Sequence, residues 1–399
     1  MTSSSKPRVL VLSRNYPNEV QKLLGLWVRQ IVAGSTEICD PKVVAPVPWA
    51  PPLPGLPENY ARFRRIAPHE WDGSVEVIRP RFLVGPGSTL IGAEAASYMA
   101  AVARPVARLR ERFPFDLIHA HFTYPDGVAA VRLGRRYGVP VIITEQVPWG
   151  PWLERMRLVR RQSIWAAKRC TFHVAISTSV RDEIESWAGT SQRLSVIPDA
   201  VDGATFTLPT NGTGRLEDQI LFVGAIREVK GVDVLMRALR LLVDKGRPVR
   251  LLVIGEGHFQ KHLADQDRVR ALTVELGLAE HVDFAGRKPL AELVAQIQRS
   301  ALLVLPSRAE SFGMVLVEAL ACGTPVVATR CGGPEDIVDE RVGVLVPPED
   351  PAALAAGIEN VLDLREQFDP AALREHALAR FGIESVTSRY AELYAAALA

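Results

Sequence analysis

Short runs of apolar and β-branched residues recur along the whole chain, and longer amphipathic stretches separate them. The runs lack the alternation of polar and apolar residues that marks a strand with one face in water. The stretches between them, such as 231–244 and 351–362, have the apolar spacing of helices. Buried strands separated by helices form parallel sheets that helices cover on both faces, so the pattern predicts a doubly wound α/β fold. The runs are RVLVLS, FDLIHA, VPVIIT, FHVAIS, LSVIP, ILFVG, VRLLVIG, HVDFAG, ALLVLPS, PVVAT and VGVLVP.

The length of the chain predicts two domains. A chain of 399 residues is too long for one compact core, because single cores stop growing at roughly 250 to 300 residues. Residues 203–218, GATFTLPTNGTGRLED, are rich in Gly, Thr and Pro and show no apolar period, which is typical of a linker. Five or six of the expected strands precede this segment and about six follow it. We therefore expect two Rossmann-like domains, residues 1–203 and residues 204–382.

The composition is that of an ordinary soluble globular protein, with 48% hydrophobic and 23% charged residues. The four cysteines form neither a C-x-x-C pair nor a dense framework, so we expect no metal site and no disulfide. The N-terminal sequence MTSSSKPRVLVLS lacks the features of a secretion signal. The apolar region 89–107 contains Glu94 and Arg104, so it falls short of the roughly 20 apolar residues that span a membrane. We expect a cytoplasmic protein.

Charge is distributed unevenly along the chain. Residues 1–203 contain 26 Lys and Arg against 18 Asp and Glu, a net charge of +8, whereas the remaining residues carry −6. The stretch 154–170, ERMRLVRRQSIWAAKRC, places Arg157, Arg160, Arg161, Lys168 and Arg169 on a predicted helix together with apolar residues. This composition is compatible with a helix that lies on an anionic leaflet. A solvated basic face with the apolar residues in the core is the alternative.

The densest local signal lies in residues 301–338, ALLVLPSRAESFGMVLVEALACGTPVVATRCGGPEDIV. A buried strand is expected to end at Leu305, a polar loop follows, and Gly313 begins a helix that continues to about Ala321. In parallel sheets, ligands bind beyond the carboxyl ends of the strands, at the N-termini of helices. We expect the backbone N–H groups of Phe312, Gly313 and Met314 to cradle a diphosphate.

Two carboxylates in this region, Glu310 and Glu318, flank the expected phosphate site, and Ser311 lies in the same loop. Outside the helix, Glu310 can accept hydrogen bonds from the hydroxyls of a sugar. Two turns into the helix, Glu318 can bridge the 2′ and 3′ hydroxyls of a ribose. The alternative is that Glu318 is a solvated helix residue and Glu310 a charge favoured by the helix dipole.

The stretch from Glu310 to Glu318 resembles the E-x7-E signature of the retaining glycosyltransferases of family 4, which have the GT-B fold. The resemblance extends along nearly the whole chain, in the order of the family's segments. Those segments are YPNEVQKLLGLWVRQ, FDLIHAHFTYPDG, VAISTSVRDEI, VIPDAVDGATF, ILFVGAIREVKGVDVL, LLVIGEGH and VDFAGR. It implies an active site in the cleft between two domains and a last helix, residues 383–399, that packs back on the first domain.

The resemblance also implies the roles of five residues. Glu310 matches the family's ligand for the donor sugar, and Glu318 its ligand for the ribose. Lys230 matches the lysine that contacts the donor diphosphate, so that a point cation replaces a metal ion and neither a metal nor a cofactor is required. His121, the second histidine of HAH, matches the histidine that reaches the donor sugar. Gly25 matches the loop glycine that approaches donor and acceptor.

The sequence departs from the family's pattern at three places. Ala225 stands where many relatives have a second phosphate-binding arginine, and Arg227 could supply that charge or could face solvent. The residues 198–202, PDAVD, replace the commoner Asn-Gly pair in a turn, and Thr144-Glu145-Gln146 stands where relatives often carry Thr-x-His. These departures concern mainly the acceptor side.

Two further residues follow predicted strands outside the main motif. Arg287 follows a predicted strand and could line the pocket for the base, because a base can stack on a guanidinium. His119 follows a buried strand and is better interpreted as a structural histidine with its hydrogen bonds satisfied.

Taken together, these features predict an enzyme that moves a sugar from a UDP- or GDP-linked donor to a glycan or lipid-linked acceptor, with retention at the anomeric carbon. The expected setting is cell-surface polysaccharide or glycolipid synthesis at the inner face of the cytoplasmic membrane, without nucleic acid as a partner. A GT-B sugar-nucleotide epimerase and a non-catalytic GT-B subunit are the alternatives. A dehydrogenase is disfavoured, since no G-x-G-x-x-G follows the first strand.

Overall fold

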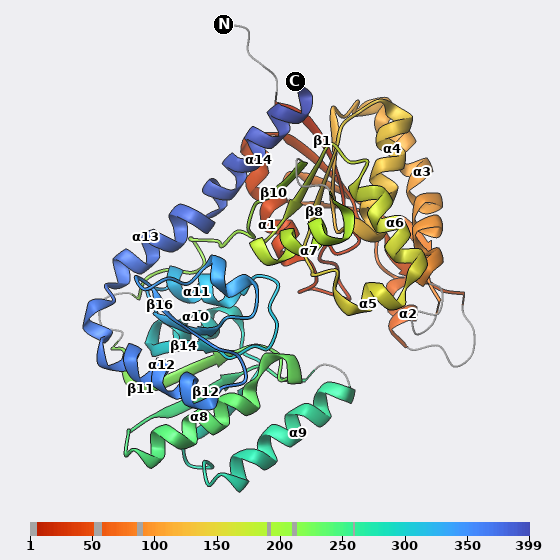
Figure 1. The fold of residues 1–399 in the computed structure, drawn as a ribbon. Coiled ribbons are helices and arrows are strands. Elements are labelled where there is room, and N and C mark those ends of the chain that lie inside the picture. Colours follow the sequence, from red (N-terminus) through yellow and green to blue (C-terminus); the bar gives the residue numbers. More distant parts are fainter. Residues whose placement is uncertain (1–5, 52–57, 86–90, 190–192, 210–213, 258–259) are drawn as a thin grey trace, which may run out of the picture. The chain divides into compact units, whose positions relative to one another are not determined.

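The chain divides into two compact units. The structure is a computed structural model that describes residues 6–51, 58–85, 91–189, 193–209, 214–257 and 260–399. Unit 1 comprises Met1–Ala200 and Ile383–Ala399, and unit 2 comprises Val201–Gly382 (Figure 1). Both units are α/β, so the structure confirms the fold class that the alternating pattern predicts.

An eight-stranded sheet forms the centre of unit 1, in the order β10-β9-β8-β7-β1-β2-β5-β4. All neighbours in this sheet are parallel except β4, which runs antiparallel to β5. A separate parallel pair joins β3 and β6. The strands are β1 Arg8–Leu12, β2 Asp40–Val44, β3 Val47–Trp49, β4 His69–Asp72, β5 Val75–Ile78, β6 Arg81–Leu83, β7 Leu117–His121, β8 Val141–Glu145, β9 Phe172–Ala175 and β10 Leu194–Val196.

Helices cover this sheet, and α3, α4 and α6 lie side by side in Figure 1. On another side of the sheet, α1 packs against the C-terminal helix α14, which also contacts β7. Val386, Tyr390, Leu393 and Tyr394 of α14 belong to the core of unit 1. The helices are α1 Leu26–Gly34, α2 Glu58–Phe63, α3 Glu94–Arg112, α4 Val128–Tyr137, α5 Gly150–Arg155, α6 Arg157–Ala167, α7 Thr178–Ala188 and α14 Ile383–Leu398.

Hydrogen bonds fasten α14 to the sheet. The buried ring of His119 in β7 makes two of them, from Nδ1 to the hydroxyl of Tyr394 (2.8 Å) and from Nε2 to Oγ1 of Thr144 (2.8 Å). Thr144 in turn bonds to the hydroxyl of Tyr390 at 3.1 Å. These contacts confirm the structural interpretation of His119.

Unit 2 is built on a six-stranded sheet in the order β13-β12-β11-β14-β15-β16, and every neighbouring pair is parallel. Among its helices, α8 packs with α9 and α12, and α11 packs with α13. The strands are β11 Leu216–Val223, β12 Arg250–Ile254, β13 Val282–Gly286, β14 Ser300–Leu305, β15 Val326–Thr329 and β16 Gly343–Val346. The helices are α8 Val232–Asp244, α9 Gln260–Glu275, α10 Leu290–Arg299, α11 Met314–Ala321, α12 Pro351–Asp363 and α13 Pro370–Phe381.

The same five residues, DPAAL, begin both α12 and α13. In each case the aspartate is the N-cap, and its carboxylate accepts hydrogen bonds from two backbone N–H groups of the first turn. The proline that follows occupies the first helical position, where its missing N–H costs nothing. The local sequence therefore fixes where these helices start.

Three details differ from the sequence-based expectations. Unit 1 contains more strands than expected, because β2 to β6 are short and rich in polar residues. The expected linker 203–218 is too long at its C-terminal end, since β11 already begins at Leu216; residues 210–213 lie outside the described part. The basic stretch 154–170 is broken at Met156, which has the non-helical angles φ −111° and ψ 68°, so α5 and α6 are separate helices. None of the described helices is long and apolar enough to cross a membrane.

Tyr394→Phe should destabilise the protein, because it leaves Nδ1 of the buried His119 without its partner. An unsatisfied buried polar group costs about 1 to 3 kcal/mol. We expect a lower midpoint in urea denaturation. Tyr137→Phe is the matched control, since the buried hydroxyl of Tyr137 has no hydrogen-bond partner among the described residues. Equal midpoints for both variants would contradict the role given to His119.

Candidate functional site

The strand order of unit 2 reverses between β11 and β14, which are neighbours in the sheet although β12 and β13 lie between them in the chain. The loops after these two strands therefore diverge to opposite sides. In open α/β sheets, ligands bind at such a switch point, beyond the carboxyl ends of the strands. Lys230 follows β11 and Glu310 follows β14, so both residues lie at this position.

Close backbone packing brings the two loops together. Gly231 has φ 64°, and a Cβ at this position would lie 2.0 Å from the carbonyl oxygen of Pro306. The N–H of Arg308 donates to the carbonyl of Val229 at 2.8 Å. Only glycine permits this approach, which places the short helical turn ending at Lys230 against the end of β14.

Lys230 and Glu310 form an ion pair with a distance of 2.6 Å between Nζ and Oε2. The same carboxylate oxygen accepts a hydrogen bond from the hydroxyl of Ser307 at 3.1 Å. Both partners are largely buried, with side chains 23% and 15% exposed. The structure thus unites a cation and a carboxylate that are 80 positions apart in the chain.

The N-terminus of α11 lies beside this ion pair. Gly313 caps the helix with φ 104°, and Phe312 is buried, with its ring 5.7 Å from that of Phe381. Within the described residues, the N–H groups of Phe312, Gly313 and Met314 make no recorded hydrogen bond. Ser311 is half-buried in the same loop. Unpaired N–H groups and the helix dipole make this end of α11 suitable for an anion.

Glu318 lies one turn further along α11 and is half-buried. Burial raises the pKa of its carboxyl group from 4.5 to about 7. Among the described side chains, none is recorded as a hydrogen-bond donor to this carboxyl. A carboxyl without a protein donor is free to accept hydrogen bonds from the hydroxyls of a ligand.

The structure places the two candidate arginines differently. Arg287 follows β13, is exposed, and forms an ion pair with Glu256 after β12 at 3.5 Å. It therefore lies at the carboxyl edge of the sheet. Arg227 is also exposed, and it lines a cavity of about 380 Å³ together with Asp233, Asp265 and other charged side chains.

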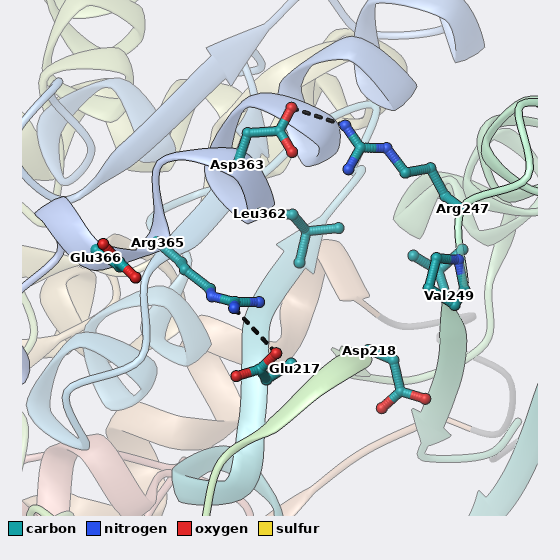
Figure 2. Close-up of a pocket in the computed structure, with 9 residues that line it drawn as sticks. Glu217, Asp218, Arg247, Val249, Leu362, Asp363, Arg365 and Glu366 are labelled. Carbon is teal, nitrogen blue, oxygen red and sulfur yellow. Dashed lines mark hydrogen bonds and ion pairs between the residues drawn. The ribbon is translucent and has the colours of Figure 1, made fainter.

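A second cavity of unit 2 lies at the opposite edge of the sheet. It has a volume of about 580 Å³, and its walls come from the start of β11 and β12 and the end of α12 (Figure 2). Four of its charged groups are paired with one another, Arg247 with Asp363 at 2.7 Å and Arg365 with Glu217 at 2.9 Å. Because this edge holds the amino ends of the strands, we do not assign the site to it.

In unit 1 the strand order reverses between β1 and β7, and His121 is the last residue of β7. Its ring is fully buried, and neither ring nitrogen has a hydrogen-bond partner in the described part of the chain. Burial lowers its pKa to about 3, so the ring is neutral at pH 7. The ring of His119 is 4.5 Å away and has both nitrogens bonded. Of these two histidines, His121 is therefore the one without a hydrogen-bond partner in the described part of the chain.

Gly25 ends the loop that follows β1 and caps α1 with φ 75°. A Cβ here would lie 1.9 Å from the carbonyl oxygen of Asn15, so the fold requires glycine. The loop lines a cavity of about 360 Å³, whose other walls include Tyr60, Phe63 and Phe82. Gly25 and His121 thus follow adjacent strands of the same sheet.

Sequence reasoning missed two buried carboxylates near these residues. Asp126 accepts hydrogen bonds from the N–H of Arg14 and the hydroxyl of Tyr98, both at 2.6 Å, and burial raises its pKa to about 7. Glu145 accepts from the indole of Trp149 at 2.8 Å and from the N–H of Thr123 at 3.1 Å. Except for Trp149, which is four residues from Glu145, their partners are 22 to 112 positions away in the chain, so the sequence gave no signal of these contacts.

Comparison with known proteins identifies the family. Residues 8–204 match the family described as Glycosyltransferase Family 4, and residues 211–377 match Glycosyl transferases group 1. The D-inositol 3-phosphate glycosyltransferase of Acidothermus cellulolyticus is 32% identical over 67% of this chain and 64% of that relative. The glycogen synthase of Mycobacterium tuberculosis is 30% identical over 71% of this chain and 69% of that relative. The chain belongs to the family 4 glycosyltransferases.

Solved structures confirm the GT-B fold. The sucrose-phosphate synthase of Thermosynechococcus elongatus superposes with a TM-score of 0.79 at 20% identity, covering 98% of both chains. The structure of Anabaena HepE in complex with UDP gives a TM-score of 0.73 at 18% identity, covering 98% of this chain and 100% of HepE. The resemblance inferred from the E-x7-E segment is confirmed at the level of family and fold.

Glu318→Gln should stabilise this family 4 chain in the absence of ligand at high pH. Because the pKa of Glu318 is raised from 4.5 to about 7, burial of its charge destabilises the folded state increasingly between these pH values and fully above pH 7. We expect the variant and the wild type to have equal melting temperatures at pH 4.5. At pH 8 we expect the variant to melt roughly 3 to 6 °C above the wild type, since about 1 kcal/mol of stability corresponds to 2 to 4 °C.

Differential scanning fluorimetry across this pH range tests the prediction. Glu375→Gln is the control, because Glu375 is an exposed glutamate on α13 and should not change the melting temperature. A Glu318→Gln variant that melts at the wild-type temperature at pH 8 would show that this carboxylate is solvated.

Proposed function

We propose that this chain transfers a sugar from a nucleoside diphosphate sugar to an acceptor hydroxyl, with retention at the anomeric carbon. The observation that carries the proposal is the Lys230–Glu310 ion pair beside the free N–H groups of α11. This arrangement offers positive charge to a diphosphate and a carboxylate to the sugar that the diphosphate carries. Membership of the family supports the reaction class.

The diphosphate would bind to Lys230 and to the N–H groups of Phe312, Gly313 and Met314. Lys230 would neutralise the charge that develops on the departing nucleoside diphosphate, which is the main electrostatic requirement of the reaction. We propose that no metal ion is needed. Arg227 could add a second charge from the loop after β11, in place of the arginine absent at Ala225.

A uridine nucleotide is the donor that we propose. HepE, which shares the fold, was solved with UDP. The ribose would bind to Glu318, whose carboxyl has no recorded donor in the described structure. Arg287 and the backbone beyond β12 and β13 are positioned to contact the base.

We propose that Glu310 binds the sugar in unit 2 and that His121 and the backbone at Gly25 are the groups of unit 1 that act on the sugar. No residue here is an obvious covalent nucleophile, so a same-face route is preferred. The bond from the anomeric carbon to the diphosphate oxygen breaks, the acceptor oxygen bonds to that carbon on the same face, and the leaving phosphate takes the acceptor's proton. A neutral His121 can donate one hydrogen bond to the sugar and stabilise this geometry.

The acceptor would bind in the cavity beside the loop after β1. Aromatic residues form part of its wall, and Arg14 and Glu94 provide polar groups that are paired at 3.0 Å. Flat aromatic surfaces next to hydrogen-bonding groups suit a glycan, either free or lipid-linked.

We further propose that unit 1 contacts an anionic membrane, at the inner face of the cytoplasmic membrane. The adjacent helices α3, α4 and α6, with α5, expose ten cations for which no carboxylate partner is recorded in the described residues, whereas the exposed acidic residues of these helices are Glu111 and Glu154. Leu158 is 56% exposed within this surface. The cations are Arg104, Arg108, Arg132, Arg135, Arg136, Arg155, Arg157, Arg161, Lys168 and Arg169.

Lys230→Met should weaken the binding of UDP at least tenfold, because a charge-assisted contact to phosphate contributes about 1.5 to 3 kcal/mol. Isothermal titration calorimetry with UDP in the presence of EDTA measures this change and tests the absence of a metal requirement. Lys245→Met is the control, since Lys245 pairs with Glu359 on the surface of unit 2. Failure of the wild-type protein to bind UDP in EDTA, with recovery in magnesium, would contradict the metal-free site.

The membrane proposal predicts that the protein sediments with vesicles containing phosphatidylglycerol and not with pure phosphatidylcholine vesicles. Arg135→Glu with Arg136→Glu should release it, because each basic residue near an anionic surface contributes about 1 kcal/mol. Arg250→Glu with Arg299→Glu, on unit 2, is the matched control. Equal release by both double variants would show that overall charge, and not this surface, is responsible.

A further inference from the structure

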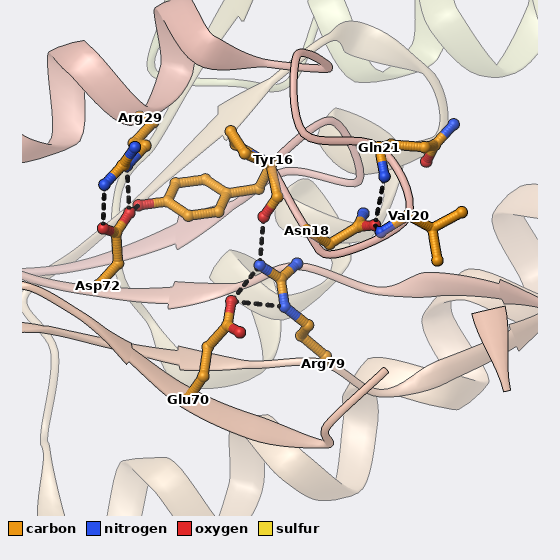
Figure 3. A network of polar contacts seen from close by, with 9 residues as sticks. Tyr16, Asn18, Val20, Gln21, Arg29, Glu70, Asp72 and Arg79 are labelled. Atoms are coloured by element: carbon orange, nitrogen blue, oxygen red, sulfur yellow. Dashed lines mark hydrogen bonds and ion pairs between the residues drawn. The ribbon is translucent and has the colours of Figure 1, made fainter. Parts of the chain in front are cut away.

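The loop between β1 and α1 is held from one side by a polar network. This loop, residues 13–25, carries Gly25 at its end and forms a wall of the 360 Å³ cavity through Arg14, Asn15, Gln21 and Leu24. Its inner part is pinned locally, since Oδ1 of Asn18 accepts from the N–H groups of Val20 (3.0 Å) and Gln21 (2.9 Å) (Figure 3). Arg14, near the start of the loop, is bound by Asp126 and Glu94. The long-range contacts of Tyr16 and Pro17 come from the β4–β5 hairpin and the residue after it.

Asp72 of β4 binds both the loop and the helix that follows it. Its Oδ2 accepts from the hydroxyl of Tyr16 at 2.8 Å, and its two oxygens accept from Nε and Nη2 of Arg29 in α1 at 2.8 and 2.7 Å (Figure 3). Burial alone would raise the pKa of Asp72, but the hydrogen bonds from Arg29 and Tyr16 outweigh it and lower this pKa. Asp72 is therefore an ionised acceptor shared by loop and helix.

Arg79 makes the second connection. It directly follows β5, and its side chain is 1% exposed. The guanidinium donates to the backbone carbonyl of Pro17 in the loop and to the carboxylate of Glu70 in β4. It also lies 5.8 Å from the centre of the Tyr16 ring. A buried guanidinium that binds a loop carbonyl fixes the backbone position at that residue.

The geometry of the hairpin explains why these groups act together. Glu70 and Asp72 are two residues apart on β4, so their side chains point to the same face. β4 pairs antiparallel with β5 at the edge of the sheet, which places Arg79 across from them. The hairpin thus presents two carboxylates and a guanidinium to one side of the loop, while other residues of the loop line the cavity.

We propose that Asp72 and Arg79 are positioning residues, which hold the loop in the conformation that receives the sugar of the donor. The inference rests on the proposed function, since it assigns the loop at Gly25 to sugar binding. Neither residue lines the cavity, so both act through Tyr16 and Pro17. Loss of the network should loosen the loop and weaken sugar-dependent steps while leaving nucleotide binding by unit 2 unchanged.

Tyr16→Phe and Asp72→Asn test the proposal, because both keep the shape of the side chain. Tyr16→Phe removes one hydrogen bond to Asp72, whereas Asp72→Asn removes the charge and one of the two acceptor oxygens that bind Tyr16 and Arg29. Hydrogen–deuterium exchange of the full-length protein should show at least tenfold faster exchange in the peptide covering residues 13–25. Turnover of UDP-glucose, with water as acceptor, should fall about tenfold, whereas the affinity for UDP should not change. The double variant should resemble Asp72→Asn, since the effects of two residues that share one hydrogen bond are not additive.

Asp116→Asn is the matched control. Asp116 binds Arg8 at the other end of β1, with distances of 3.3 Å to Nε and 3.0 Å to Nη2. This variant should lower the melting temperature comparably without changing loop exchange or turnover. Unchanged loop exchange in Tyr16→Phe and Asp72→Asn, faster exchange with unchanged turnover, or an equal loss of turnover in Asp116→Asn would each overturn the proposal.

Different results would contradict the proposed function and the positioning role. A wild-type protein that binds neither UDP nor UDP-glucose would contradict the proposed function, and the positioning role would fall with it. Normal binding and turnover in the wild type, together with wild-type turnover in the loop variants, would contradict the positioning role alone.

Discussion

The reversal of strand order in each sheet is the constraint on which the candidate residues of both units depend. In unit 2 the reversal lies between β11 and β14, and in unit 1 between β1 and β7. Loops that leave two adjacent parallel strands in opposite directions open a space at the carboxyl edge of the sheet. Lys230 and Glu310 flank this space in unit 2, and His121 and the loop ending at Gly25 flank it in unit 1.

Glycine residues in these loops allow the backbone to approach neighbouring carbonyl groups closely. Gly231 against Pro306 in unit 2 and Gly25 against Asn15 in unit 1 are both in the left-handed region, and a side chain at either would collide with a carbonyl oxygen. The first contact brings Lys230 to Glu310. The second sets the course of the loop that the β4–β5 hairpin supports from the other side.

The hydrogen bonding of polar groups distinguishes structural residues from candidate functional ones. His119 and His121 lie on the same strand with their rings 4.5 Å apart, yet only His119 has its nitrogens bonded within the described protein. Glu318 is half-buried and has no recorded donor among the described residues. Asp126 and Glu145 are buried and accept several hydrogen bonds, although Oδ2 of Asp126 has no partner in the described part of the chain. Since an unpaired buried polar group is costly, a ligand group that pairs with His121 would gain affinity.

The apolar runs predicted β1 and β7 to β16, because burial on both faces demands an unbroken apolar sequence. They did not predict the interior strands β2 and β5, which contain charged residues. The edge elements could not be predicted in this way. β4, with the sequence HEWD, is polar because its side chains reach solvent or bind the loop after β1.

The contacts between candidate site residues could not be predicted from the sequence either. The spacing of Glu310 and Glu318 follows from one helix, but the pairing of Lys230 with Glu310 depends on β11 lying beside β14. Likewise, the contact between Tyr16 and Asp72 joins residues 56 positions apart through the placement of a hairpin at the sheet edge.

The most direct measurement compares the binding of UDP with the turnover of UDP-glucose in His121→Ala. The account predicts wild-type affinity for UDP, because the groups proposed to bind the nucleotide belong to unit 2, and a turnover number at least tenfold lower, because the sugar loses a contact made in the reacting state. A variant with normal turnover, or one in which UDP affinity falls together with turnover, would contradict the division of nucleotide and sugar binding between the two units.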